Sequence, residues 1–108
     1  MNYHIKFHPL VASDLDAIAR VIIDYAGPEI AARKPAEIET IIATLHITPH
    51  KGSIRDEIAP SLRAIPAGRK AVVAFVVDDD AKDVLIYAIT YGGADWMERL
   101  GARASEIR

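Results

Sequence analysis

Two long apolar runs, residues 71–77 (AVVAFVV) and 84–91 (VLIYAITY), constrain the fold of this chain more than any other feature. β-Branched and aromatic residues are frequent in both runs, which is typical of buried strands. The six residues between them, 78–83, are mostly charged. Two strand-like runs joined by a short polar segment predict a β-hairpin.

The N-terminal part predicts one strand and one helix. Apolar and polar side chains alternate over residues 2–8, which indicates a half-buried strand, and Pro9 ends it because proline cannot donate to a sheet. A helix is then predicted from Ser13, a suitable N-cap, to the break at Gly27 and Pro28. The apolar stripe of this helix consists of Leu15, Ile18, Ala19, Ile22 and Tyr25.

A second helix is predicted from about Glu29 to His46. Its apolar residues are Ile30, Ile38, Ile41, Ile42 and Leu45. Pro35 lies inside this stretch, where a proline removes a hydrogen bond and costs roughly 3 kcal/mol. The sequence leaves two alternatives open, because the helix can kink at Pro35 or break and restart there.

A short strand is predicted at residues 54–58 and a short terminal helix at about residues 95–100. The order of elements predicts an α+β fold, in which an N-terminal strand and a helical hairpin pack on one face of a twisted antiparallel sheet. The 108 residues show no linker and no repeat, which indicates a single domain over residues 1–108. Two helices cover only one face, so the other face is expected to meet solvent, a partner or an active site.

The composition narrows the classes of protein to which the chain can belong. Without cysteine it has no disulfide, no cysteine-bound zinc and no thiol nucleophile. A net charge of −2 lowers the expectation of direct nucleic-acid binding, because proteins that bind phosphate backbones usually carry a basic excess or stripe. The N-terminus lacks a signal-peptide pattern, and no apolar run approaches the about 20 residues of a membrane helix. We therefore expect a soluble, cytoplasmic protein without membrane contact.

The titratable residues show no pattern of a metal site. His4 and His8 share one face of the predicted N-terminal strand, but two ligands without a third do not form a site. His46 and His50 flank a loop and show no partner pattern, and the acidic residues 78–80 are interpreted as a charged turn. No metal ion and no other cofactor is expected.

Three segments carry a resemblance to a known family. They are residues 7–18 (FHPLVASDLDAI), residues 52–63 (GSIRDEIAPSLR), and residues 68–96, which contain both apolar runs and end in YGGADW. In order and spacing the chain resembles the RelE/ParE toxins of type II toxin–antitoxin modules, and more closely the ParE (plasmid stabilisation protein) branch.

The resemblance implies a helical hairpin packed on a twisted antiparallel sheet, in agreement with the residue patterns. It also implies an antitoxin partner, usually encoded beside the toxin, whose extended and partly helical tail wraps the toxin. ParE-like members inhibit DNA gyrase and are not known as enzymes, whereas RelE-like members cleave mRNA in the ribosome. The expected function is therefore a gyrase-inhibiting toxin. An mRNA endoribonuclease and an inactive relative that only binds are the alternatives.

Metal-independent cleavage of RNA needs a base, an acid, and a cation for the charge on the phosphorane. Members of the RelE branch often supply arginine at positions where this sequence has Val76, Ala88 and Ala94. The loss of three cations weighs against the nuclease.

The remaining candidates for a catalytic or target-binding surface are Arg63, Arg69 and Tyr91, with Trp96 as a further target contact. Each of these residues also has a structural interpretation. The arginines can form salt bridges at the rim, the tyrosine can lie half buried at a strand end, and the tryptophan can anchor the terminal helix. Arg55, which two acidic residues follow, is expected to form a structural ion pair.

The residues expected to contact an antitoxin lie on the helical hairpin and are Ile22, Tyr25, Ile38 and Ile42. They are expected to serve the core and a binding groove together. On the face that the helices leave open, Ala74, Val76 and Ala88 are predicted to form an apolar patch. We expect an antitoxin tail, or a second copy of the chain in a homodimer, to cover this patch.

Overall fold

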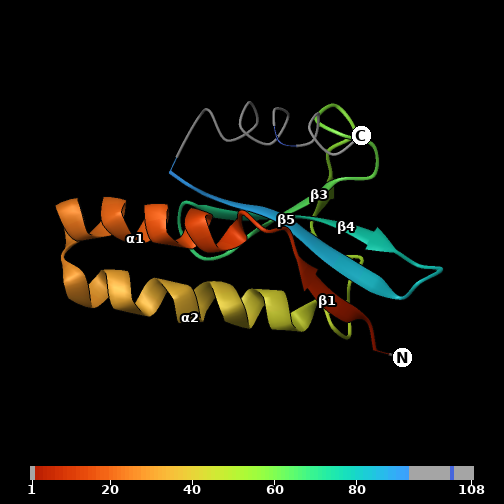
Figure 1. Ribbon diagram of the computed structural model, residues 1–108, viewed down its shortest axis with the longest axis horizontal. Helices are drawn as coiled ribbons and strands as arrows, with labels where there is room; N and C mark the ends of the chain where they lie inside the picture. Colours follow the sequence, from red (N-terminus) through yellow and green to blue (C-terminus); the bar gives the residue numbers. More distant parts are fainter. Residues whose placement is uncertain (1, 93–102, 104–108) are drawn as a thin grey trace.

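A helical hairpin lies on one face of a five-stranded sheet in the computed structural model (Figure 1). The structure describes residues 2–92 and residue 103. The elements are β1 (His4–Phe7), α1 (Val11–Ala26), α2 (Pro28–Thr44), β2 (Ser53–Ile54), β3 (Arg63–Pro66), β4 (Ala71–Asp78) and β5 (Asp83–Tyr91). The strand order in the sheet is β1-β5-β4-β3-β2, and the predicted α+β class is confirmed. No helix in these described ranges has the length and apolar character needed to cross a membrane.

The predicted hairpin is the centre of the sheet, formed by β4 and β5. Ala74 pairs with Ala88 and Phe75 with Ile86, so Tyr87 is an extra residue that forms a bulge in β5. Phe75 is fully buried under the helices, whereas Ala74 belongs to a separate cluster on the other face. The alternation of β4 therefore separates two apolar layers, one on each side of the sheet.

β1 pairs with β5 in parallel, so the prediction of a wholly antiparallel sheet is wrong at this strand. His4 lies opposite Asp83 and Phe7 opposite Ile86. A short turn would make two strands antiparallel, but both helices and three strands lie between β1 and β5 in the chain. The direction of β1 is thus decided by how the helices return to the sheet, which local sequence does not encode.

Both helices differ from the prediction at their ends. α1 begins at Val11, ahead of the predicted cap, and the Ser13 hydroxyl donates to the Leu10 carbonyl oxygen instead. The amide of Leu10 donates to Nδ1 of His8, just before the helix begins. α2 ends at Thr44 and continues through Pro35 without a break. Packing of α2 on α1 and the sheet compensates for the hydrogen bond that Pro35 cannot donate.

The main core lies between the helices and the sheet. Its largest fully buried side chains are Phe75, Ile22, Ile38, Leu45, Ile86, Val73 and Val84. Burying one such side chain contributes about 1.5–3 kcal/mol to stability. The apolar stripes of both helices therefore supply much of the free energy that holds the hairpin on the sheet.

The segment between α2 and β4 contains one strand more than predicted. β3 is a strand that the sequence analysis does not predict, and Pro66 occupies its last position. β2 is only Ser53–Ile54, shorter than the predicted strand over residues 54–58. The predicted terminal helix at residues 95–100 lies outside the described residues.

Candidate functional site

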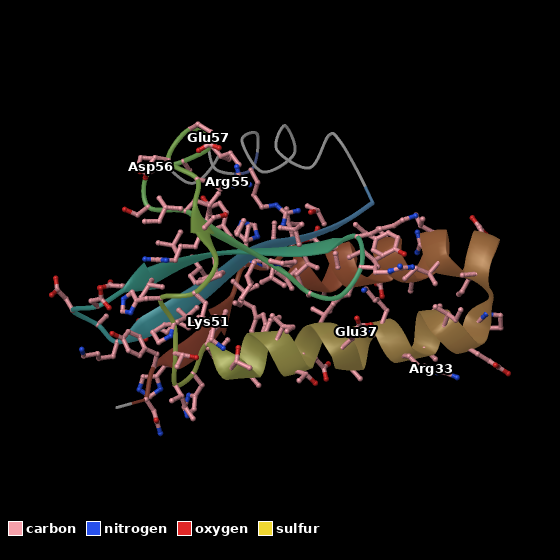
Figure 2. All side chains as sticks on the ribbon, turned by 180° about the vertical axis from the view of Figure 1, so that it is seen from behind. Arg33, Glu37, Lys51, Arg55, Asp56 and Glu57 are labelled. Atoms are coloured by element: carbon pink, nitrogen blue, oxygen red, sulfur yellow. The ribbon has the colours of Figure 1, made fainter. Side chains whose placement is uncertain are left out.

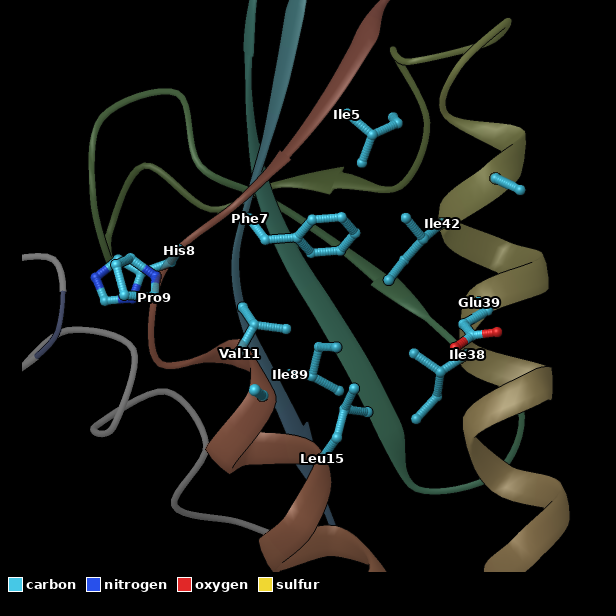
Figure 3. Close-up of a pocket in the computed structure, with 12 residues that line it drawn as sticks. Ile5, Phe7, His8, Pro9, Val11, Leu15, Ile38, Glu39, Ile42 and Ile89 are labelled. Atoms are coloured by element: carbon cyan, nitrogen blue, oxygen red, sulfur yellow. The ribbon is translucent and has the colours of Figure 1, made fainter.

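An apolar groove of about 660 Å³ opens between β1, the first turns of α1 and the C-terminal half of α2 (Figure 3). Its apolar walls include Ile5, Phe7, Val11, Leu15, Ile38, Ile42 and Ile89. The polar lining residues are His8 and Glu39. A concave, mostly apolar surface with a few polar groups is the usual form of a binding site.

Phe7 is the exposed part of this groove. Its ring is directed across the groove toward Ile42 (Figure 3), and 54% of the residue remains accessible. Leu10, which follows β1 in the chain, is also largely exposed. Large apolar groups that stay exposed beside a hollow indicate a contact surface for another molecule.

The edge of the sheet at β1 is open next to this groove. The amides of His4 and His8 donate to the carbonyl oxygens of Lys82, just before β5, and of Ile86 in β5. Because backbone groups alternate along a strand, Ile5 and Phe7 direct their N–H and C=O groups away from β5. β1 thus offers two residues with which an added strand can pair.

The residues of this chain that are predicted to contact an antitoxin lie in different places in the structure. Ile38 and Ile42 are buried and also line the groove, so they belong to the core and to the groove wall. Ile22 is 1% exposed within the main core and does not line the groove. The side chain of Tyr25 lies outside what the structure describes.

The predicted target-binding residues are not brought together at one point. Arg63 donates to the Lys51 carbonyl oxygen at 3.3 Å and lines a small cleft beside His50 and Asp79. Arg63 lies opposite Phe75, and Tyr91 lies opposite Ala71, four residues along β4. That offset is about 13 Å along the strands.

Arg69 and Tyr91 both lie near Lys34 of α2. The Lys34 ammonium donates to the Arg69 carbonyl oxygen at 3.0 Å and lies 5.8 Å from the centre of the Tyr91 ring. The side chain of Arg69 belongs to an exposed residue in the β3–β4 turn. Trp96 lies outside the described residues.

The predicted apolar patch on the second face is not open, which corrects the expectation that a partner covers it. Ala74 and Ala88 are buried there with Leu62, which comes from the loop between β2 and β3. Val76 is partly buried against the same cluster. The chain therefore covers these residues itself.

The loop that carries Leu62 is held by polar contacts. Arg55 pairs with Glu57 at 3.3 Å, which confirms the expected ion pair, and the Ser61 amide donates to Asp56 at 2.8 Å. Figure 2 shows Arg55, Asp56 and Glu57 grouped on the side of the sheet away from α2. Ala94, the third position where relatives carry arginine, lies outside the described residues.

A polar cluster at the N-terminal end of β1 was missed by the sequence interpretation. The Tyr3 hydroxyl donates to Oδ1 of Asp79 at 2.6 Å, and Nε2 of His50 lies 2.8 Å from the same oxygen. Nδ1 of His46 lies 2.7 Å from the Tyr3 carbonyl oxygen. These residues come from three distant parts of the chain, so no local motif predicts the cluster.

The hydrogen bond between Tyr3 and Asp79 shifts the pKa of both groups. Its acceptor, the Asp79 carboxylate, raises the pKa of the Tyr3 hydroxyl above the ordinary value. The same bond, assisted by His50, lowers the pKa of Asp79. Across residues 2–92 and 103, no three histidines or carboxylates gather as a metal-binding group. The hydrogen bonds of this cluster connect Tyr3, next to β1, with Asp79 in the β4–β5 turn.

The comparisons with known proteins concern almost the whole chain. A family model described as the ParE toxin of the type II toxin–antitoxin system parDE matches residues 5–96. A search of curated protein sequences found no match.

Solved structures share the fold. A chain of the chromosomal ParDE toxin–antitoxin system from Pseudomonas aeruginosa superposes with a TM-score of 0.70 and 24% identity, over 84% of this chain and 97% of that chain. A chain of the RelBE2 toxin–antitoxin complex from Mycobacterium tuberculosis gives 0.57 and 19%, over 85% and 100%. An arginine double mutant of the Escherichia coli toxin RelE in the free state gives 0.65 and 9%, over 98% and 97%.

Proposed function

The chain belongs to the ParE toxin family of type II toxin–antitoxin systems, and we propose that it inhibits DNA gyrase when free and is neutralised by an antitoxin seated in the apolar groove. Both the antitoxin and gyrase are proteins, so binding surfaces rather than catalytic groups carry this function. Both also belong to the bacterial cytoplasm, where we place the chain.

The main observation in support of an antitoxin-binding site in the groove is that the ring of Phe7 is exposed above the buried side chains of Ile38 and Ile42. A partner segment that inserts apolar side chains here removes Phe7 from water without rearranging the core. A few central side chains, often aromatic, supply most of the binding energy in protein interfaces.

The open edge of β1 supports an extended antitoxin segment. The N–H and C=O groups of Ile5 and Phe7 are directed away from β5 and can pair with an added strand. Main-chain hydrogen bonds would then give affinity, and the groove beside them would select the side chains. The predicted contacts Ile38 and Ile42 belong to this seat, whereas Ile22 contributes through the fold.

Gyrase inhibition is favoured over RNA cleavage by the arrangement of cations. Arg63 is separated from Tyr91 by about 13 Å along the strands, and Arg63 lies in a cleft whose lining includes the carboxylates of Asp56 and Asp79. Val76 and Ala88 on the second face are apolar, where the RelE branch often has arginine. A phosphorane needs its cations and its proton donor within one small site, and Arg63 and Tyr91 are too far apart to share one.

The test is inducible expression of the chain alone, and together with its neighbouring gene, in a bacterial host. The proposal expects loss of colony formation that the neighbouring gene restores. Purified chain is then expected to inhibit supercoiling by DNA gyrase and to leave ribosome-bound mRNA intact. Transcript cleavage without gyrase inhibition would assign the RelE-type activity instead, and unimpaired growth with good expression would indicate an inactive relative.

A further inference from the structure

We propose that Glu39 makes the groove selective, by requiring a lysine or arginine in the antitoxin segment that occupies it. This inference rests on the proposed function, because it concerns the same groove. It adds a chemical requirement that apolar contacts alone do not impose.

Among the described residues that line the groove, Glu39 is the one acidic residue, and none is lysine or arginine. It belongs to the α2 wall of the groove (Figure 3), next to Ile38 and one helical turn before Ala43. Its position therefore places a negative charge at the margin of an otherwise apolar surface.

Some acidic residues of the described ranges have partners within the chain, whereas others, such as Asp16, Asp24 and Glu29, have none among the described residues. Glu37 lies 3.5 Å from the Lys34 ammonium, and Asp83 lies 2.9 Å from the Lys6 ammonium. Glu39, in contrast, has no ion pair or side-chain hydrogen bond with any described residue. In the free chain water solvates this carboxylate, since Glu39 is exposed.

A bound segment changes the surroundings of Glu39. As apolar side chains fill the groove, they displace water from the carboxylate and make an unpaired charge unfavourable. A basic side chain at that point replaces the lost solvation with an ion pair, whereas an acidic one is repelled. The same carboxylate thus favours the correct antitoxin and disfavours others.

The opposite side of the groove does not repeat this charge. His8 is the other polar lining residue, and its Nδ1 already accepts the Leu10 amide at 3.1 Å. Nε2 is therefore the ring nitrogen left to face a partner. Among the described lining residues the negative charge lies on the α2 side alone, so the basic side chain of the segment is expected to point toward α2.

The experiment measures the affinity of the full chain for the protein encoded by the neighbouring gene, by titration calorimetry at low and high salt. Glu39→Gln is compared with the wild type and with Asp24→Asn, which removes one charge from an exposed residue that does not line the groove. We expect roughly tenfold weaker binding for Glu39→Gln at low salt, and a smaller salt dependence. Asp24→Asn should bind as the wild type does.

Glu39→Lys should weaken binding further, and a charge-reversed partner, in which one lysine or arginine of its toxin-contacting segment becomes glutamate, should restore it. Urea denaturation of each variant checks that the fold is kept. Equal affinity of Glu39→Gln and the wild type would overturn the inference and leave the proposed antitoxin seat intact. If the wild-type chain itself does not bind, the proposed function fails and the inference with it.

Discussion

The ammonium of Lys34 on α2 donates a hydrogen bond of 3.0 Å to the carbonyl oxygen of Ala67, which lies 33 residues farther along the chain. The same ammonium reaches the Arg69 carbonyl oxygen and lies 3.5 Å from Glu37. Lys34 is buried, so these contacts replace its hydration. One side chain thus connects the middle of the helical hairpin to the β3–β4 turn.

Replacing Lys34 by methionine is expected to lower the free energy of unfolding by about 1–3 kcal/mol. Methionine keeps most of the apolar stem but leaves the carbonyl groups of Ala67 and Arg69 without their donor. Urea denaturation measures the loss, and Arg33→Met, at the exposed neighbouring position, is the matched control. The control should change stability by no more than about 0.5 kcal/mol. Equal stability of the two variants would contradict this role of Lys34.

Asp14 joins α1 to β5 and to residue 103. Its carboxylate accepts two hydrogen bonds from the Arg103 guanidinium, at 2.7 and 2.9 Å, and one from the Ile89 amide at 3.0 Å. The Ile89 amide lies beyond the point where β1 ends, so Asp14 replaces a strand at that edge of β5.

Asp14→Asn is expected to destabilise the chain by about 3 kcal/mol, because it removes the carboxylate charge that faces the partly buried Arg103 guanidinium. Asp16→Asn, at an exposed position of the same helix, should have little effect. The double variant Asp14→Asn, Arg103→Gln should lose less stability than the sum of the two single changes. Additive losses in thermal or urea unfolding would show that the two residues are not coupled.

The Tyr3–Asp79 hydrogen bond predicts how stability depends on pH. Asp79 has a pKa below its ordinary 3.8 in the folded chain, so its contribution is present above that pH and is lost as the pH falls through the folded value. Tyr3 has a pKa above its ordinary 10.0, so its contribution is present below pH 10.0 and is lost as the pH rises through the folded value.

Tyr3→Phe removes the bond, so the difference in stability between wild type and variant should be constant near neutral pH. It should shrink at both extremes. Urea unfolding of both proteins across the pH range measures this difference. A difference that is the same at every pH would show that the bond does not stabilise the fold.

Gly52 precedes β2 with a φ of +75°, and a Cβ at this position would overlap the carbonyl oxygen of Ala64 in β3. Gly27 has a φ of +90°, but a Cβ added there would have no atom within 4 Å beyond its chain neighbours. Gly27→Ala should therefore cost only the backbone strain of its φ of +90° and ψ of 166°, a region essentially restricted to glycine, at about 1–3 kcal/mol. Gly52→Ala should cost more, because β3 must also move. Equal shifts of the urea midpoint would contradict the close approach of β2 and β3.

The sequence predicts best the elements whose signals are local. The β4–β5 hairpin follows from two β-branched runs and a polar turn, and the helical hairpin follows from apolar stripes and the break at Gly27. The parallel pairing of β1 does not follow, since only the return of the helices to the sheet decides it. β3 was missed because its Pro66 gives the same local signal as a turn.

The candidate site was predicted in part. Ile38 and Ile42 were expected at a groove because they lie on the apolar stripe of a helix, and they do line one. Phe7 has the same alternating pattern as Tyr3, yet Tyr3 is buried and Phe7 is exposed. Tyr3 contacts His50 of the loop after α2 and Lys82 of the β4–β5 turn. Such tertiary contacts cannot be predicted from the local sequence.

The measurement that tests the central claim most directly is the affinity of Phe7→Ala for the protein encoded by the neighbouring gene, by titration calorimetry. Phe7 is more than half exposed, so its truncation should change the urea midpoint little. If the groove is the antitoxin seat, the dissociation constant should rise at least about 30-fold, the size expected for a central aromatic contact. An unchanged dissociation constant in a folded Phe7→Ala variant would contradict the account, because it would place the antitoxin elsewhere on the chain.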